Sequence, residues 1–453
     1  MKKKLISIIL ITLLIINGAI IITYIQKVKK GDYLITNNHL IEGYSDKISY
    51  YNGDKVELKV HCRQPSYSIE VSRYGKEQVV VMQEKNLPGI RQDFYPNASE
   101  AGAKWKTTYS FTIPDNWDNG MYAAKLSDNK GNISYITFIV NGKQGELKGD
   151  IAVLASTNTW QAYNDWGGVS FYNNASEDSD EGKSFGSGIV SMQRPNHYAD
   201  PTLGSSHLAG AELHVLSWME ANGYPYKLIS DSDFHKDSHI LDPFKILIIN
   251  THNEYWTENM YNSLEKFLNR GGSVLYLSGN GLFWKAVLND NDQIEVRKDF
   301  KNHILDGTQG GYWAKELQRP ESAVLGVRFQ NSDFSIPSPY KVLKADHWIY
   351  QGTGLKNGDL IGKTGLTKVR NSSGGASGWE TDQMDKNSPK NTVLLARGAN
   401  PKGKGAEMTY YDHPGGGGVF SVGSITFGGS LAVDKDLSIM VNNVLKHFLA
   451  KSE

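Results

Sequence analysis

The sequence predicts a protein of two structural classes, an all-β sandwich followed by an α/β domain with β insertions. Residues 31–142 hold short runs of alternating apolar and polar residues, separated by turns rich in Asn, Asp and Gly, as in an immunoglobulin-like sandwich. Residues 150–453 begin with continuous apolar runs that alternate with amphipathic segments, as in a parallel sheet covered by helices. Residues 143–149 are the predicted linker.

The amino terminus has the pattern of a membrane segment. Lysines at positions 2–4 precede a continuous apolar run at residues 5–25, which is long enough to cross a bilayer as a helix. Three further lysines follow directly, and no small-residue cleavage site separates them from the run. We therefore expect residues 1–30 to be a signal anchor with one transmembrane helix. The body would lie outside the cell membrane, or be secreted if the segment is cleaved.

Composition excludes some partners and some chemistry. The 48 basic and 48 acidic side chains balance, so no excess of charge points to a nucleic-acid partner. Cys62 is the single cysteine, which excludes an intrachain disulfide and predicts a small buried residue in a strand. Tryptophan, tyrosine and glycine are plentiful, which suits a carbohydrate or small-molecule surface but equally suits β-rich packing.

The strands of the sandwich follow from alternation of period two. No catalytic cluster is visible among them, so the sandwich by itself suggests a binding or spacer module. Strands are expected at residues 55–60, 67–74, 77–82, 109–113, 121–126 and 134–140.

The α/β domain opens with a buried strand at residues 150–156, followed by a polar and aromatic loop. Residues 207–222 have apolar side chains at helical spacing, and Gly223 stops this helix. Residues 245–284 read as strand, polar turn, helix, strand and polar turn, a right-handed βαβ unit. The other expected elements are a strand at 226–231, β-hairpin material at 340–353 and 359–369, late strands at 392–398, 406–412 and 418–425, and a closing helix at 437–449.

Polar and aromatic side chains follow three of the predicted parallel strands. His252 and Glu254 come after the first strand of the βαβ unit, and Asn280 comes after the second. Tyr163 and Tyr172 follow the opening strand of the domain. Because parallel strands end at one edge of a sheet, where open α/β folds bind ligands, we expect these side chains to converge. Taken singly, each has an ordinary alternative role in packing or helix capping.

These residue types indicate metal-dependent hydrolysis. Tyrosine and glutamate oxygens are hard donors that suit a Lewis-acidic metal such as ferric iron, which can polarise an amide carbonyl and acidify a bound water. His252 would serve as a base and Asn280 as a donor to the developing oxyanion. The run around Asn280 has the strand-turn-helix form of a nucleophile elbow, but asparagine occupies the elbow and Ser278 precedes the turn. Neither serine nor cysteine catalysis is therefore expected.

A second set of residues offers another metal site. His235 and His239 are four apart, in a loop-like context that lacks an HExxH pattern. Their acidic neighbours are Asp231, Asp233 and Asp242. Solvated loop histidines are the simpler interpretation of this set. His207 and His214 are expected on one helix, facing other helices or solvent.

The chain also carries landmarks of a known family. They are AYND around Tyr163, SFYN around Tyr172, AELHVLSWMEANGY, SDSDFH, THNEYW, SGNGLFW and SGWETD with Glu380. The sandwich shares IEGYSDKISYYNGDKVEL and FTIPDNWDNGMY. Over about residues 40–449 the chain thus resembles the family of the N,N-dimethylformamidase large (beta) subunit. The spacing of THNEYW and SGNGLFW is the more specific part of the likeness.

The resemblance implies a β-sandwich followed by a class I glutamine-amidotransferase-like α/β domain without the catalytic cysteine. It implies hydrolysis of a small, formamide-like amide to a carboxylic acid and an amine. The ligands of a mononuclear Fe3+ would be Tyr163, Tyr172 and Glu254. The catalytic residues around the metal would be His252, Asn280 and Glu380.

Two departures from the family leave parts of this picture open. The two tyrosines are much closer together in this sequence, which leaves the second ligand and the pocket shape open. An anchor is foreign to a cytosolic amide-degrading enzyme, so the substrate and any small-subunit partner stay open, as does a homo-oligomer. The alternative function is a non-catalytic cell-surface carbohydrate-binding or structural module. Exposed Trp160, Trp166 and Trp256 would then stack on sugars.

Overall fold

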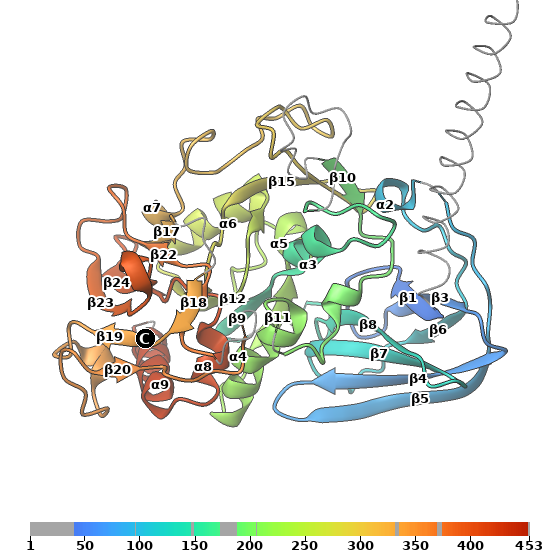
Figure 1. The fold of residues 1–453 in the computed structure, drawn as a ribbon, viewed down its shortest axis with the longest axis horizontal. Helices are drawn as coiled ribbons and strands as arrows, with labels where there is room; N and C mark the ends of the chain where they lie inside the picture. The colour runs from blue at the N-terminus through green and yellow to red at the C-terminus, as the bar shows by residue number, and fades with distance from the viewer. Residues whose placement is uncertain are drawn as a thin grey trace, which may run out of the picture.

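The chain folds into a mixed α/β, sheet-rich structure, shown in Figure 1 as a computed structural model. The predicted anchor at residues 5–25 and part of the predicted linker lie outside the residues that the structure describes. The described residues are 40–95, 97–145, 149–172, 188–204, 206–330, 335–368 and 374–451.

The helices of the described residues do not support the expected membrane protein. A helix that crosses a bilayer needs about 20 consecutive apolar residues. The longest helix of the described residues, α9 (Lys435–Ala450), has 16 residues and is amphipathic. No helix in the described ranges is long and apolar enough to span a membrane. This finding does not support the predicted transmembrane signal anchor or the predicted cell-membrane location with an extracytoplasmic body.

Two antiparallel-rich sheets make up the amino-terminal part of the described chain. One has the strand order β1-β3-β6 and the other β2-β8-β7-β4-β5. Each strand predicted from alternation is present, and β5 is longer than expected. The strands of the first sheet are β1 (Ile41–Ser45), β3 (Lys55–Cys62) and β6 (Tyr109–Thr112). Those of the second are β2 (Ser49–Tyr50), β8 (Ile133–Val140), β7 (Gly120–Asp128), β4 (Ser66–Tyr74) and β5 (Gln78–Pro88).

The two sheets share one apolar core. Every second residue of β3 points inward, so Val56, Leu58 and Val60 are buried with Cys62 against residues of β4, β7 and β8. This pattern is the reason that alternation in the sequence located the strands. The predicted burial of Cys62 is confirmed.

A nine-stranded sheet forms the centre of the second part, in the order β11-β9-β12-β14-β25-β24-β23-β19-β20. The first five strands run parallel and the remaining four extend the sheet in antiparallel fashion. The parallel strands are β11 (Lys227–Ser230), β9 (Ile151–Ala155), β12 (Ile246–Thr251), β14 (Ser273–Ser278) and β25 (Gly418–Ser421). The antiparallel strands are β24 (Glu407–Asp412), β23 (Val393–Gly398), β19 (Tyr340–Val342) and β20 (Leu360–Ile361).

Helices cover both faces of this sheet (Figure 1). Ile246 and Ile248 of β12 join a core cluster with α4 (Ala209–Ala221) and α9 on one face. Leu247 and Ile249 join the opposite cluster with α6 (Glu258–Asn269). Both sets of side chains are buried, which explains why the strand reads as a continuous apolar run rather than as an alternation.

Two local expectations fail in this part. The segment after β9 is helix α3 (Thr157–Tyr163) rather than a loop, because its first turn is fixed by distant side chains. Asp231 accepts the backbone N–H of Asn158 at 2.8 Å, a contact that the local sequence does not show. The turn at Asn280 leads into strand β15 (Trp284–Leu288) rather than a helix. A four-stranded sheet with the order β10-β16-β15-β13 therefore lies beside the ends of β12 and β14. Its other strands are β10 (Gly188–Ser191), β16 (Gln293–Val296) and β13 (Tyr255–Trp256).

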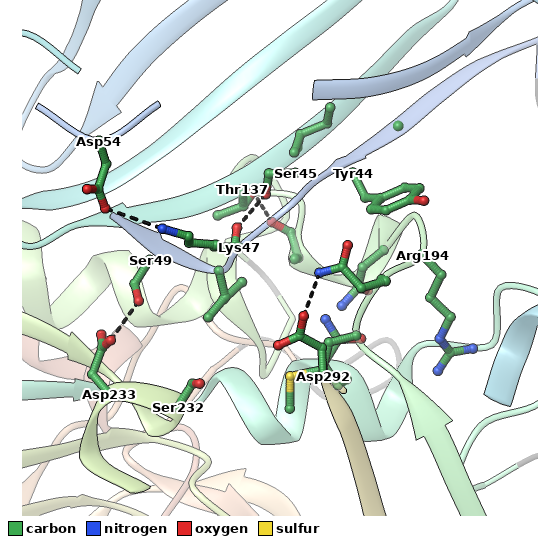
Figure 2. A pocket seen from close by; sticks show the side chains of 18 of the residues that line it. Tyr44, Ser45, Lys47, Ser49, Asp54, Thr137, Arg194, Ser232, Asp233 and Asp292 are labelled. Atoms are coloured by element: carbon green, nitrogen blue, oxygen red, sulfur yellow. Dashed lines mark hydrogen bonds and ion pairs between the residues drawn. The ribbon is translucent and has the colours of Figure 1, made fainter. Parts of the chain in front are cut away.

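Buried contacts join the sandwich to the α/β part, and a cavity lies between them beside these contacts. Met121 and Ile139 of the sandwich belong to the core cluster of the α/β part. Between the two parts lies a cavity of about 390 Å3 (Figure 2). Its acidic side chains are already paired with neighbours: Asp54 with Lys47, Asp233 with Ser49 and Asp292 with Gln193. The two parts are thus packed on each other directly rather than only tethered.

Candidate functional site

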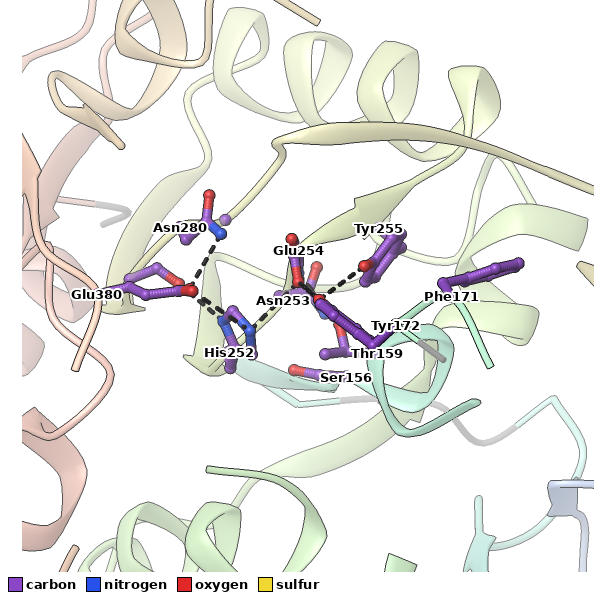
Figure 3. Close-up of polar contacts among 12 residues, drawn as sticks. Ser156, Thr159, Phe171, Tyr172, His252, Asn253, Glu254, Tyr255, Asn280 and Glu380 are labelled. Atoms are coloured by element: carbon purple, nitrogen blue, oxygen red, sulfur yellow. Dashed lines mark hydrogen bonds and ion pairs between the residues drawn. The ribbon is translucent and has the colours of Figure 1, made fainter. Parts of the chain in front are cut away.

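The candidate site lies where β9, β12 and β14 end at one edge of the sheet (Figure 3). Helix α3 follows β9 and carries Tyr163 at its carboxyl end. His252 and Glu254 follow β12, and Asn280 follows β14. The structure therefore brings side chains from three separate strand ends together, as the parallel order of the strands predicts.

The chain turns sharply after two of these strands. Thr251 has φ 52° and Asn280 has φ 51°, both in the left-handed region. Asparagine tolerates this conformation, whereas a β-branched threonine is strained by about 1–3 kcal/mol. The backbone N–H of Asn280 donates to Asp382 Oδ1 at 2.9 Å, which holds the turn in place. Such a turn directs the Asn280 side chain towards the site rather than along the strand.

Glu254 is the hub of the cluster. Its side chain is buried, and its Oε2 accepts the hydroxyl hydrogen bond of Tyr172 at 2.7 Å. His252 Nε2 lies 3.3 Å from the same oxygen. The backbone N–H of Glu254 donates to Thr159 Oγ1 at 3.1 Å, so helix α3 and the end of β12 are locked together.

The rings of Tyr163 and Tyr172 stack on each other beside the Glu254 carboxylate. Their ring centroids are 4.2 Å apart and the rings are stacked. The Tyr172 hydroxyl accepts a hydrogen bond of 2.8 Å from the Tyr255 hydroxyl. Lys298 Nζ donates to the Tyr255 hydroxyl at 2.9 Å and lies 4.0 Å from the centroid of the Tyr172 ring. A chain of donors thus runs from Lys298 through Tyr255 and Tyr172 to Glu254.

On the other side of Glu254, His252 connects it to a second carboxyl. The Nδ1 of His252 lies 3.1 Å from the Gly279 carbonyl, which can only accept, so Nδ1 carries a proton. The Nε2 faces Glu254 and also lies 3.7 Å from Glu380 Oε2. Asn280 Nδ2 donates to Glu380 Oε2 at 3.0 Å. Glu380 comes from the end of strand β21 (Ser377–Trp379), far away in the sequence.

Burial and mutual charge set the protonation of this cluster. Burial opposes the imidazolium of His252, but its contact with Glu254 and the charge of Glu380 raise the pKa of His252 to about 9. Burial acts to raise the pKa of Glu254, yet the contact with His252 outweighs it and lowers that pKa. Burial raises the pKa of Glu380 to about 7. Burial and the charge of Glu254 raise the pKa of Tyr163 and of Tyr172 well above the usual value. The site therefore holds an imidazolium–carboxylate pair beside a carboxyl that titrates near neutrality.

All six residues predicted for the site lie in this cluster, and their roles stay predictions. Three further members escaped the sequence reasoning. Tyr255 is next to Glu254 in the chain and could have been found from the THNEYW run, whereas Lys298 has no local signal. His207 precedes α4 instead of lying on it, and its ring packs against Tyr163 at 4.6 Å. Both ring nitrogens of His207 are buried without a hydrogen-bond partner.

The other residues considered from the sequence do not form a metal site. His235 Nδ1 contacts Thr257 Oγ1 and His239 Nδ1 contacts Asp242, each at 2.9 Å. Within the described ranges, no group of three or more His, Cys, Asp or Glu could hold a metal ion. A set of two tyrosines and one glutamate is of a different composition, so the iron prediction stands apart from this finding.

The tryptophans proposed to stack on sugars are not on the surface. Trp160 and Trp256 are 0% exposed and Trp166 is 5% exposed. Buried indole rings cannot contact a polysaccharide from outside, so the expectation of exposed aromatic side chains here is wrong.

Comparison with known proteins finds relatives of one kind. The chain is 25% identical over 425 residues to the N,N-dimethylformamidase beta subunit of Alcaligenes sp, covering 76% of this chain and 54% of that protein. It is 26% identical over 430 residues to the protein of the same name from Paracoccus aminophilus, with the same coverage. The chain thus spans about half the length of the curated relatives it matches.

Solved structures add little to this likeness. The structure described as mmIFT52 N-terminal domain is 14% identical and covers 51% of this chain and 86% of that chain, with a TM-score of 0.32. A score this low carries no argument about fold or function. The family is shown instead by a sequence model, described as N,N-dimethylformamidase beta subunit-like, C-terminal, which matches residues 68–442. The chain belongs to the N,N-dimethylformamidase beta subunit-like family.

Proposed function

We propose that the chain is a metal-dependent hydrolase of a small amide, with its reaction centre at Glu254. The observation that carries the proposal is the contact of 2.7 Å between the Tyr172 hydroxyl and Glu254 Oε2, beside His252 at the strand ends. The curated relatives are named for hydrolysis of the amide N,N-dimethylformamide, so a small formamide-like amide is the substrate class that we infer. The class I amidotransferase-like character of the α/β part belongs to the same proposal.

The residues present fit a mononuclear iron. Tyr163, Tyr172 and Glu254 offer three hard oxygen donors of the kind that ferric iron prefers. Tyr172 and Glu254 oxygens are close enough to share one small cation. The raised pKa of both phenols, caused by burial and by the charge of Glu254, means that a bound cation is needed to hold them as tyrosinates. Iron bound here would supply Lewis acidity towards the amide carbonyl and towards water.

The remaining residues would handle protons and orient the substrate. Amide hydrolysis takes a proton from water and delivers one to the leaving nitrogen. Glu380, at the Nε2 end of His252, is the group that we assign to the proton from water in place of His252, because the raised pKa of His252 keeps its imidazole protonated near neutral pH. His252 is held by the Gly279 carbonyl and by two carboxylates, so we assign it to charge balance and proton delivery. Asn280 Nδ2 donates to Glu380, so we assign Asn280 to orienting this carboxyl rather than to the oxyanion contact predicted from the sequence. Its buried Oδ1 has no hydrogen-bond partner and is available to accept one from the substrate.

Two measurements on the purified chain test this function. The first is the metal content, with the visible spectrum recorded for a tyrosinate-to-iron charge-transfer band. The second is release of amine from formamide, N-methylformamide and N,N-dimethylformamide. We expect stoichiometric iron and amine release, and we expect Glu254→Gln and Tyr172→Phe to lose the metal and at least about 100-fold of the activity.

Tyr411→Phe is the matched control. Tyr411 is a buried tyrosine whose hydroxyl donates one hydrogen bond of 2.7 Å to the Val324 carbonyl, outside the site. Its variant should keep iron and activity. A folded, colourless chain with no bound metal and no amine release would refute the proposal. Because the relatives are named as beta subunits, a partner chain is proposed as well, and amine release that appears only after adding one would identify it.

A further inference from the structure

The loop between the two tyrosines is held by side chains that the proposed reaction does not use. This loop, residues 164–171, connects Tyr163 at the end of α3 with Tyr172. It is short and irregular, with Gly167 at φ 83° and Gly168 at φ 88°. Its geometry decides where the Tyr172 hydroxyl lies relative to Glu254. Any group that fixes this loop therefore fixes the site.

A buried arginine fixes the loop by hydrogen bonds to its backbone carbonyls. Arg194 is 1% exposed. Its guanidinium donates to the carbonyls of Asn164 and Val169 at 2.9 Å each and to that of Trp166. Its Nε donates to the Ser191 carbonyl at 2.9 Å. Burial lowers the pKa of Arg194 to about 9, which leaves it charged at neutral pH, and charge-assisted hydrogen bonds are the stronger kind.

The sandwich holds the same loop from the other side. The ring of Trp166 is 5% exposed and lies 5.5 Å from Trp105 and 6.0 Å from Phe94, measured between ring centroids. Its Nε1 donates to Glu42 Oε2 of strand β1 at 3.0 Å. These three partners all come from the amino-terminal part of the chain. Trp166 therefore anchors the loop to strand β1 and to the segment between β5 and β6, in a small apolar cluster beside the sandwich core.

The Trp166 side chain is the closely packed part of the interface near the site. The cavity between the two parts lies alongside, with Arg194 on its wall (Figure 2). An open cavity transmits little restraint, whereas a buried aromatic ring with a hydrogen bond transmits much. Restraint on the loop thus comes from Trp166 and Arg194 rather than from the rest of this wall.

We propose that strand β1 and the segment that holds Phe94 and Trp105 position the reacting groups: they hold Trp166 and, together with Arg194, fix the loop that sets Tyr163 and Tyr172 against Glu254. Trp166 and Arg194 are thus positioning residues. The inference rests on the proposed function for its effect on catalysis, but its structural half stands on the contacts alone. It replaces the view of the sandwich as a spacer.

Amide hydrogen exchange of the full chain tests the structural half. Trp166→Ala removes both the ring contacts and the hydrogen bond to Glu42, whereas Trp166→Phe keeps a ring in place. The matched control is Trp117→Ala, because Trp117 is also buried (8% exposed) but packs on Tyr122 in the sandwich core, with ring centroids 5.0 Å apart. We expect exchange in residues 164–172 to speed up at least about tenfold in Trp166→Ala, less in Trp166→Phe, and not in the control.

Kinetics of amide hydrolysis test the catalytic half. We expect kcat to fall by about 10- to 100-fold in Trp166→Ala with a smaller change in KM, because the reacting groups are displaced and not removed. Arg194→Lys, which keeps the charge but loses the fork, should fall between this variant and the wild type. The control should keep kcat within about twofold.

The outcomes separate this inference from the proposed function. Unchanged exchange in residues 164–172 of Trp166→Ala overturns the inference, whatever the activity. A loosened loop with unchanged kcat overturns the catalytic half. A wild-type chain without iron or amidase activity defeats the proposed function, and the exchange comparison then still decides whether the sandwich holds the loop.

Discussion

Buried Glu212 should make the wild type less stable as pH rises. The substitution Glu212→Gln should remove this pH-dependent loss of folding stability. Glu212 is 0% exposed, on α4 behind the site. Its Oε1 accepts from the Ser156 N–H at 3.1 Å and from Trp160 Nε1 at 2.8 Å, and its Oε2 has no partner. The amide oxygen of Gln can take both hydrogen bonds. Its NH2 would stand where the unpartnered oxygen lies now.

The sign and size follow from proton linkage. Burial raises the pKa of Glu212 from 4.5 to about 8, so the folded state keeps a proton that the unfolded state has released. The stability is fully present below pH 4.5 and is lost as pH rises towards 8, by about 1.4 kcal/mol per pH unit. Between pH 5.5 and 8 the wild type should therefore lose about 3 kcal/mol more than Glu212→Gln. Other buried carboxyls cancel, because both proteins contain them.

Urea unfolding monitored by tryptophan fluorescence, at several pH values between 5 and 8.5, measures this difference. The control is Glu220→Gln on the same helix, because Glu220 pairs with Arg73 at 2.7 Å. Burial acts to raise the pKa of Glu220, but the pairing with Arg73 lowers it overall, so its contribution should be lost as pH falls. Parallel profiles for wild type and Glu212→Gln would show that Glu212 does not carry a buried proton, and would refute the reasoning.

Three further predictions concern the site and the core. Asn280→Gly keeps the left-handed turn but removes the 3.0 Å hydrogen bond to Glu380, so activity should fall by about 10- to 100-fold with stability within ~1 kcal/mol of wild type. A fall in activity that is matched by an equal loss of folding free energy would contradict this role. Lys298→Met removes the donor to Tyr255 and to the Phe171 carbonyl, and should reduce kcat by roughly tenfold, whereas the exposed Lys301→Met should not. Leu275→Ala in β14, at 0% exposure, should cost about 2–5 kcal/mol in urea unfolding, while Val79→Ala, at 50% exposure, should cost almost nothing.

Sequence reasoning reached the parts of the site that lie next to recognisable strands. The apolar run of β12 and the periodic helix α6 predicted a βαβ unit, and parallel strand order then predicted that His252, Glu254 and Asn280 would meet. These steps rest on local pattern and on the fixed hand of the crossover. Glu380 was found only through the family likeness, since nothing near it marks a strand end of the central sheet.

The remaining parts of the site depend on long-range contacts. Lys298 reaches the tyrosines from the segment after β16, and His207 reaches Tyr163 from a bend before α4. The helical state of residues 157–163 depends on Asp231 and Glu212, which lie elsewhere in the chain. No window of neighbouring residues contains these partners, so periodicity cannot report them.

By itself the sequence predicted the strands of the amino-terminal part, the parallel core of the α/β part and the strand ends that carry polar side chains. These properties follow from the local pattern of apolar residues, which alternates in the sandwich strands and is continuous in the parallel strands. Only the tertiary structure decided the protonation of His252 and Glu380 and the burial of the tryptophans once expected to face sugars. It also decided the packing of Trp166 against Phe94 and Trp105 of the amino-terminal part. Each of these depends on which distant groups become neighbours, and burial and charge act through space rather than along the chain.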